Sequence, residues 1–257
     1  MSLEHLLNTN LHVDLDIDLK SVKFRKVQAI LADPKKQFII VDGVIGAGKT
    51  TVISLIEKYI NNSDTNLKIK AIYEPVKVWS DTGALQYFYN NIEKHCYEFQ
   101  TYSYITRIKS VIDEIYTTPD ADIYILERSI WTDKYIFMEL LKDLVGDMRT
   151  NMYNTWWEMW SYLMPMRVDK WVLLDTSLEE SLKRISSRNR NGESAVDKDY
   201  QTKLYVKHIE FYNQLKEENK PVVIIESDIM DTDFITNTDK IEKIIALMQL
   251  LEKAAPK

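Results

Sequence analysis

A glycine-rich segment directly after a short apolar run constrains this chain more than any other feature of its sequence. Gly43–Thr50 reads GVIGAGKT, and it follows Phe38–Asp42, which reads FIIVD. Three of the six glycines in the chain lie in this one segment, where glycine lets backbone N–H groups curl round an anion. The spacing matches the phosphate-binding P-loop, which joins a strand to the N-terminus of a helix.

The residues of this loop can be assigned to parts of a nucleotide. Lys49 is expected to reach the β and γ phosphates, and the Thr50 hydroxyl is expected to bind Mg²⁺. A helix is predicted over Lys49–Ile60, with its positive end toward the phosphates. The predicted nucleotide-binding residues of the loop are Gly43, Val44, Ile45, Gly46, Ala47, Gly48, Lys49, Thr50 and Thr51.

Composition limits the remaining possibilities. The 257 residues, 45% hydrophobic and 28% charged, are typical of an ordinary soluble globular protein. The net charge of −6 argues against general binding to nucleic acid. The single cysteine, Cys96, permits no internal disulfide and is expected to be a packing residue. No apolar run is long enough to span a membrane, and the acidic N-terminus resembles neither a secretory signal nor a transit peptide, so we expect an intracellular, cytoplasmic protein.

Strand-like and helix-like segments alternate after residue 37. This order predicts a doubly wound, five-stranded parallel sheet flanked by helices, in which ligands bind outside the carboxyl ends of the strands. Residues 1–37 are expected to form an N-terminal extension with a helix at Leu19–Ala32, and residues 38–257 a single domain. Besides Phe38–Asp42, strands are predicted at 68–73, 122–126, 170–174 and 221–225, and helices at about 83–94, 97–117, 131–145, 150–163, 178–188, 197–219 and 237–254.

Two of the predicted strand ends carry groups suited to phosphoryl transfer. Glu74 closes the second strand, and a carboxylate there could accept a proton from an attacking hydroxyl. The third strand ends in Glu127 and Arg128, which suit a second Mg²⁺ ligand and a phosphate clamp. A surface carboxylate and a structural ion pair are the alternatives for these two features.

A basic cluster lies farther along the chain. Arg184 and Arg188 are four residues apart on a predicted helix, so they share a face, and Arg190 follows in a polar loop. A lid of this kind could close on a triphosphate and neutralise the charge of the transferring group. A solvated basic helix end is the alternative.

With these segments in place, the chain resembles the deoxyribonucleoside kinases of the animal and viral type, over residues 38–234. Its motifs are closest to those of kinases for deoxycytidine, deoxyguanosine and deoxyadenosine. Besides the P-loop and the arginine-rich lid, the resemblance rests on Glu74-Pro75-Val76 with Trp79, on Phe99-Gln100-Thr101-Tyr102 with Arg107, and on Glu127-Arg128-Ser129 with Asp133-Lys134-Tyr135-Ile136-Phe137.

The resemblance implies phosphorylation of a deoxyribonucleoside at its 5′-hydroxyl, in nucleotide salvage, by a homodimer, with ATP or another nucleoside triphosphate as the phosphate donor. Glu74 would be the base, Arg128 and Lys49 would assist at the phosphates, and Thr50 and Glu127 would hold Mg²⁺. ATP would also contact Arg184, Arg188 and Arg190, with its adenine covered by a segment that includes Asp228, Asp231 and Phe234. The nucleoside would be held by Glu74, Trp79, Tyr89, Phe99, Gln100, Arg107, Arg128, Asp133, Phe137 and Glu193.

Some features depart from the family pattern. Val44 replaces a small polar residue, Gly192 stands where a second acid is common, and Trp131 replaces a smaller or phenolic residue. These changes affect the expected shape of the pocket more than its chemistry. Trp156, Trp157 and Trp160, at helical spacing, are expected to form a packing or dimer surface.

The expected base preference follows from one pair of charges. The resemblance places Arg107 and Asp133 over one end of the base, where the carboxylate could accept from an exocyclic amino group and the thymine methyl would desolvate the pair. Deoxycytidine, deoxyadenosine or deoxyguanosine is therefore expected to be preferred over thymidine. A nucleoside monophosphate kinase and a regulatory P-loop switch are the alternative functions, although the chain lacks the Asn-Lys-x-Asp motif of guanine-binding switches.

Overall fold

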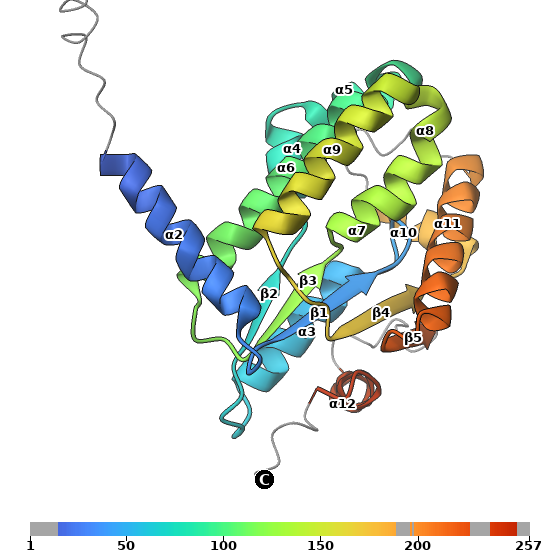
Figure 1. The fold of residues 1–257 in the computed structure, drawn as a ribbon. Coiled ribbons are helices and arrows are strands. Elements are labelled where there is room, and N and C mark those ends of the chain that lie inside the picture. The colour runs from blue at the N-terminus through green and yellow to red at the C-terminus, as the bar shows by residue number, and fades with distance from the viewer. Residues whose placement is uncertain (1–14, 189–195, 197, 227–236, 251–257) are drawn as a thin grey trace, which may run out of the picture.

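Five parallel strands form the centre of the computed structural model, which describes residues 15–188, 196, 198–226 and 237–250 (Figure 1). The strand order is β2-β3-β1-β4-β5, and every neighbouring pair is parallel. The α/β fold and its five-stranded parallel sheet are therefore confirmed. The strands are β1 (Gln37–Asp42), β2 (Ile69–Ile72), β3 (Ile123–Glu127), β4 (Lys170–Asp175) and β5 (Val222–Glu226).

Helices cover both faces of this sheet, which explains why its strands are apolar along their length. Figure 1 shows α3 and α12 against one face and α6 and α11 across the other. The described helices are α2 (Leu15–Ala32), α3 (Lys49–Asn61), α4 (Val76–Asp81), α5 (Ala84–Asn90), α6 (Ile92–Thr117), α7 (Ile130–Thr132), the π-helix η1 (Asp133–Met138), α8 (Glu139–Val145), α9 (Asp147–Leu163), α10 (Leu178–Arg188), α11 (Lys198–Glu217) and α12 (Thr238–Leu247). None of the helices in the described part of the chain is both long and apolar enough to cross a membrane.

Two hydrophobic clusters make up the core. The first surrounds the sheet, and it includes Val27 and Leu31 of α2, both with no exposed surface. The second lies among the helices α4 to α9, away from the sheet, and it contains Trp79, Phe88 and Phe99. The sheet cluster therefore supports the strand ends, and the helical cluster supports the aromatic side chains beside them.

Strand register brings three chain segments together at one point. Val41 of β1 lies opposite Glu127 of β3, and Ile72 of β2 lies opposite Leu126. Counting one residue on from Val41 and two on from Ile72, the same register places Asp42, the last residue of β1, and Glu74 beside Arg128. The sheet itself thus gathers charged groups that are distant in sequence.

The predicted helices omit α4, and they differ from the observed ones in two further places that bear on the pocket. The break between α5 and α6 falls at Asn91, earlier than expected, because the Asn91 side chain caps α6 by accepting from the Lys94 backbone N–H. The predicted helix 131–145 is divided, since it contains the π-helical turn η1. Local propensity does not reveal such a turn, which depends on the packing around it.

Candidate active site

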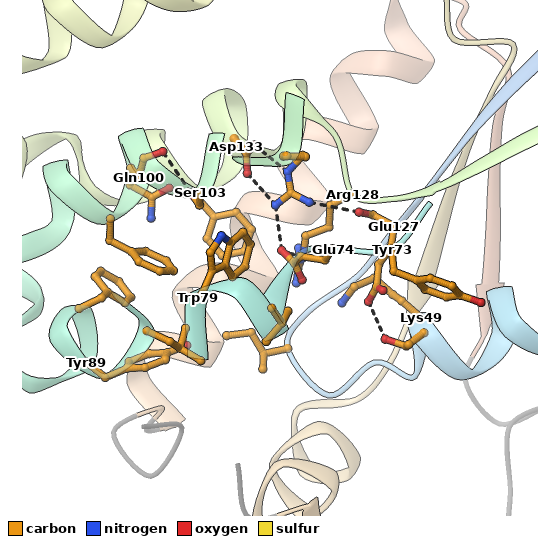
Figure 2. A pocket seen from close by; sticks show the side chains of 18 of the residues that line it. Lys49, Tyr73, Glu74, Trp79, Tyr89, Gln100, Ser103, Glu127, Arg128 and Asp133 are labelled. Atoms are coloured by element: carbon orange, nitrogen blue, oxygen red, sulfur yellow. Dashed lines mark hydrogen bonds and ion pairs between the residues drawn. The ribbon is translucent and has the colours of Figure 1, made fainter. Parts of the chain in front are cut away.

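A cavity of about 160 Å³ opens at the carboxyl ends of β1, β2 and β3. Figure 2 shows Gln100 and Tyr89 at one end of this pocket, Lys49 and Glu127 at the other, and Glu74 between them. The predicted site residues that line it are Ile45, Gly46, Lys49, Thr50, Glu74, Trp79, Tyr89, Phe99, Gln100, Arg107, Glu127, Arg128, Asp133, Phe137 and Arg188. The fold therefore collects most of the predicted residues round one cavity, although their individual roles stay predictions.

The P-loop forms the phosphate-binding end. Gly46 has a φ of +81°, and a Cβ at this residue would lie 2.6 Å from the Ser181 carbonyl oxygen, so only glycine fits. The ammonium of Lys49 is buried, and it donates to the carbonyls of Gly43 and Val44 at 3.1 and 3.0 Å. Burial and the charge of Arg128 lower the pKa of Lys49 to about 7, against the opposing effect of nearby carboxylates.

Two oxygen-bearing side chains lie side by side at this end. The Thr50 hydroxyl donates to Glu127 Oε1 at 2.8 Å. Mg²⁺ is commonly held by one or two protein oxygens, with phosphates and waters completing an octahedron. The Thr50 and Glu127 oxygens are of the number and kind that fit Mg²⁺ bound jointly with the phosphates of a nucleotide.

A buried ion network occupies the middle of the pocket. Arg107 forms a bidentate ion pair with Asp133. Its Nε donates to Oδ2 at 2.8 Å, and its Nη2 donates to Oδ1 at 3.0 Å. The same Nη2 donates to Glu74 Oε1 at 2.8 Å, and Nη1 donates to the Glu127 carbonyl at 3.2 Å. Burial alone would lower the pKa of Arg107, but Asp133 and Glu74 outweigh burial and raise it, so this arginine stays charged.

Glu74 is held in its ionised form by the cations around it. Its side chain is 14% exposed, and burial would favour the neutral acid. Arg128, Arg107 and Lys49 together outweigh burial and lower the pKa of Glu74 to about 2. The carboxylate is therefore negative at any physiological pH.

Arg128 lies just beyond β3 with a backbone that few non-glycine residues adopt. Its φ is +63°, and its N–H donates to the Val41 carbonyl at 3.0 Å. The guanidinium lies over the ring of Phe137, 4.7 Å from the centroid, and its Nε is 3.5 Å from Glu74 Oε1. Left-handed backbone costs an ordinary residue about 1–2 kcal/mol, so the surrounding contacts must stabilise this conformation.

Aromatic rings and an amide form the other end of the pocket. Gln100, Ser103 and Arg107 share one face of α6 because they recur at helical spacing, and that face looks into the cavity. The rings of Phe99 and Trp79 meet edge to face at 5.6 Å. This end can hold a flat, polar-edged ring.

Two arginines of α10, the predicted lid helix, contact the P-loop and the pocket. Arg184 donates to the Ala47 carbonyl at 3.3 Å and to Glu180 at 2.9 Å, and Arg188 lines the pocket. Five predicted site residues lie outside the part of the chain that the structure describes: Arg190, Glu193, Asp228, Asp231 and Phe234.

Comparison with known proteins identifies the family. Residues 39–251 match the deoxynucleoside kinase family. The chain belongs to this family. A fowlpox virus protein named "Probable deoxycytidine kinase FPV151" is 30% identical over 210 residues, covering 81% of this chain and 85% of the viral protein. Deoxycytidine kinase 1 of Xenopus laevis is 23% identical over 241 residues (82% and 88%), and human deoxycytidine kinase is 25% identical over 195 residues (66% and 73%).

This deoxynucleoside kinase has six pocket residues that were not among the predicted site residues. They are Tyr73, Val76, Leu85, Phe88, Ser103 and Tyr200. Phe88 stacks on Phe99 at 4.6 Å, and Tyr73 directly precedes Glu74, so the position of Tyr73 at a strand end was an available signal. Tyr200 comes from α11, and nothing local in the sequence links it to the P-loop.

Trp131, a departure from the family pattern, does not line the kinase pocket. Its ring meets Trp171 of β4 edge to face at 5.7 Å, and it packs against the sheet cluster. Trp131 also packs against the helical cluster, so its unusual size affects packing between the sheet and the helices rather than the wall of the cavity.

Proposed function

We propose that this kinase transfers the γ-phosphoryl group of ATP to the 5′-hydroxyl of a deoxyribonucleoside, giving the 5′-monophosphate. One observation carries the proposal. The ionised carboxylate of Glu74 lies between a P-loop and a ring-binding pocket, within one cavity. Such a position suits a group that receives the hydroxyl proton while the phosphoryl group is transferred.

The cations of the pocket supply the remaining chemistry. Lys49, Arg128 and Arg188 line the phosphate end, where fixed positive charge stabilises the charge that spreads over a transferring phosphoryl group. Thr50 and Glu127 would hold Mg²⁺, which neutralises phosphate charge when it is bound. The proton moves from the 5′-hydroxyl to a Glu74 oxygen, the new O–P bond forms, and the bond to ADP breaks.

The base preference that we propose rests on Arg107 and Asp133. Both side chains line the pocket and are nearly fully buried, and they form a bidentate ion pair. A thymine methyl against this pair would place an apolar group on a buried carboxylate that it cannot satisfy, whereas an exocyclic amino group could donate to Asp133. Deoxycytidine, deoxyadenosine or deoxyguanosine is therefore preferred, in line with the deoxycytidine kinase names of the relatives.

We also propose a cytoplasmic homodimer that uses α9. One side of this helix exposes several large apolar side chains, and a contiguous apolar patch of this kind is unusual on the surface of a monomeric protein. Its members are Met148, Met152, Trp156, Met159, Tyr162 and Leu163, and they are between 38% and 74% exposed. Sedimentation should give twice the mass of the chain, and Trp156→Glu should shift it toward the monomer.

One assay separates the leading function from its alternatives. Labelled ATP is offered with each of the four deoxyribonucleosides, with thymidine monophosphate, and with water alone. Transfer to deoxycytidine, deoxyadenosine or deoxyguanosine at the highest kcat/KM supports the proposal. Transfer only to the monophosphate would indicate a nucleoside monophosphate kinase, and hydrolysis without transfer would indicate a switch. A kcat/KM for thymidine at or above the other three would refute the base preference.

A further inference from the structure

Arg128 is contacted from outside the pocket by a buried histidine that no motif of the chain singles out. His208 lies on α11, is 1% exposed, and does not line the cavity. Its Nε2 is 3.3 Å from Arg128 Nη1, and its Nδ1 is 2.8 Å from the Leu204 carbonyl oxygen. These two contacts determine which ring nitrogen carries the proton.

A carbonyl oxygen only accepts hydrogen bonds, so Nδ1 of His208 must carry the proton that goes to Leu204. A guanidinium only donates, so Nε2 must be the unprotonated nitrogen that accepts from Arg128. The neutral ring agrees with its surroundings, because burial and the charge of Arg128 lower the pKa of His208 well below its ordinary value. A charged imidazole would have no acceptor to offer Arg128.

A neutral acceptor suits a cation that must act on phosphates. The carboxylates of Glu74 and Asp42 already lie 3.5 and 4.0 Å from this guanidinium, so a third carboxylate would neutralise it further, whereas the imidazole fixes its direction and adds no charge. The ring of Phe137 lies against the guanidinium on another side and meets His208 edge to face at 6.4 Å. The side chain of Arg128 is thus held by the imidazole and the phenyl ring while its strained backbone stays in place.

We propose that His208 is a positioning residue, which as a neutral hydrogen-bond acceptor sets the orientation of the Arg128 guanidinium in the pocket. The proposal rests on the proposed function, in which Arg128 stabilises the transferring phosphoryl group. His208 touches neither the phosphates nor the nucleoside, so its effect must pass through Arg128.

Two amide variants separate the contacts of the imidazole. The amide of His208→Gln reaches the position of Nε2 and can still accept from Arg128. The amide of His208→Asn reaches only the position of Nδ1, so it keeps the Leu204 contact and loses the one to Arg128. Each variant is made alone and together with Arg128→Ala, and thermal melting confirms that each folds. If His208→Asn does not fold, His208→Met replaces it, because a thioether is only a weak acceptor.

The two variants are expected to differ in kcat, and this difference is expected only when Arg128 is present. His208→Gln should keep kcat within about threefold, while His208→Asn should lower it by about 10–100-fold with little change in the nucleoside KM, since a charged donor loses its buried partner. With Arg128→Ala, His208→Asn should have no further effect. The same loss on both backgrounds, a full loss in His208→Gln, or no loss in His208→Asn would overturn the positioning role. Full activity of Arg128→Ala, or no transfer to any deoxyribonucleoside, would instead refute the proposed function.

Discussion

Replacing Glu74 by glutamine removes one charge and almost no volume from the centre of the pocket. The amide oxygen can still accept from Arg107, which now lies 2.8 Å from Glu74 Oε1, but it cannot take up the hydroxyl proton. Loss of a general base typically lowers kcat by about 10²–10⁴-fold, or about 3–5 kcal/mol in the barrier. Nucleoside affinity should change less, because the rings that enclose the base are untouched.

The same substitution should change stability in acid. The folded-state pKa of Glu74, about 2, lies below its ordinary value of 4.5. The ionised carboxylate therefore stabilises the fold above pH 4.5, and this contribution is lost as the pH falls from 4.5 toward 2. The difference corresponds to about 3 kcal/mol. Glu74→Gln should be less stable than the parent at pH 7, and the gap should narrow as the pH falls below 4.5.

Steady-state kinetics at pH 7 and urea unfolding at pH 7, 5, 4 and 3.5 measure both effects. Glu217→Gln is the matched control, because Glu217 is an exposed glutamate in the last turn of α11, and it should change neither quantity. A kcat for Glu74→Gln close to that of the parent would refute the base assignment. A stability gap that stays constant down to pH 3.5 would refute the account of the buried charges.

Three further variants test other parts of the pocket. Arg188→Ala should reduce kcat and kcat/KM together, about 10²-fold or more, if this arginine acts in the transition state; a rise in the KM for ATP alone would make it a docking residue. Arg107→Met with Asp133→Ala should raise the ratio of thymidine to deoxycytidine kcat/KM by at least about tenfold, and an unchanged ratio would contradict the proposed reading of the base. Gly46→Ala should weaken ATP binding about tenfold or more in calorimetry, since the added methyl meets the Ser181 carbonyl and the backbone φ is positive; unchanged affinity would show that the loop adjusts freely.

The parts that could be predicted from sequence are those encoded in short segments. An apolar run followed by GVIGAGKT specifies β1, the loop and the start of α3, because each needs only neighbouring residues. The strand ends at Glu74 and Glu127 follow from the same reasoning, since a parallel sheet brings its carboxyl ends to one edge. Contacts between side chains on different helices and strands could not be predicted in this way.

Long-range contacts account for what the sequence did not reveal. Arg107 contacts Glu74 as well as Asp133, and this second contact joins α6 to the end of β2. The left-handed backbone of Arg128 and the approach of His208 from α11 likewise depend on how distant elements pack. The alternation of apolar segments and the capping residues predict where helices and strands lie. The packing of those elements determines which charged side chains become neighbours.

The two hydrophobic clusters of this kinase support different ends of its pocket, and side chains such as Trp131 and Trp160 pack against both. Trp79, Phe88 and Phe99 belong to the cluster among the helices, whereas Val41, Val44 and Ala47, at the end of β1 and in the P-loop, belong to the cluster round the sheet. Substitutions of Trp79, Phe88 or Phe99 therefore reshape the ring-binding end of the pocket through the helical cluster, and they leave the residues under the P-loop in place. A lineage of such enzymes can drift from one nucleoside to another through viable intermediates, because each step retains the machinery of transfer while the choice of acceptor changes.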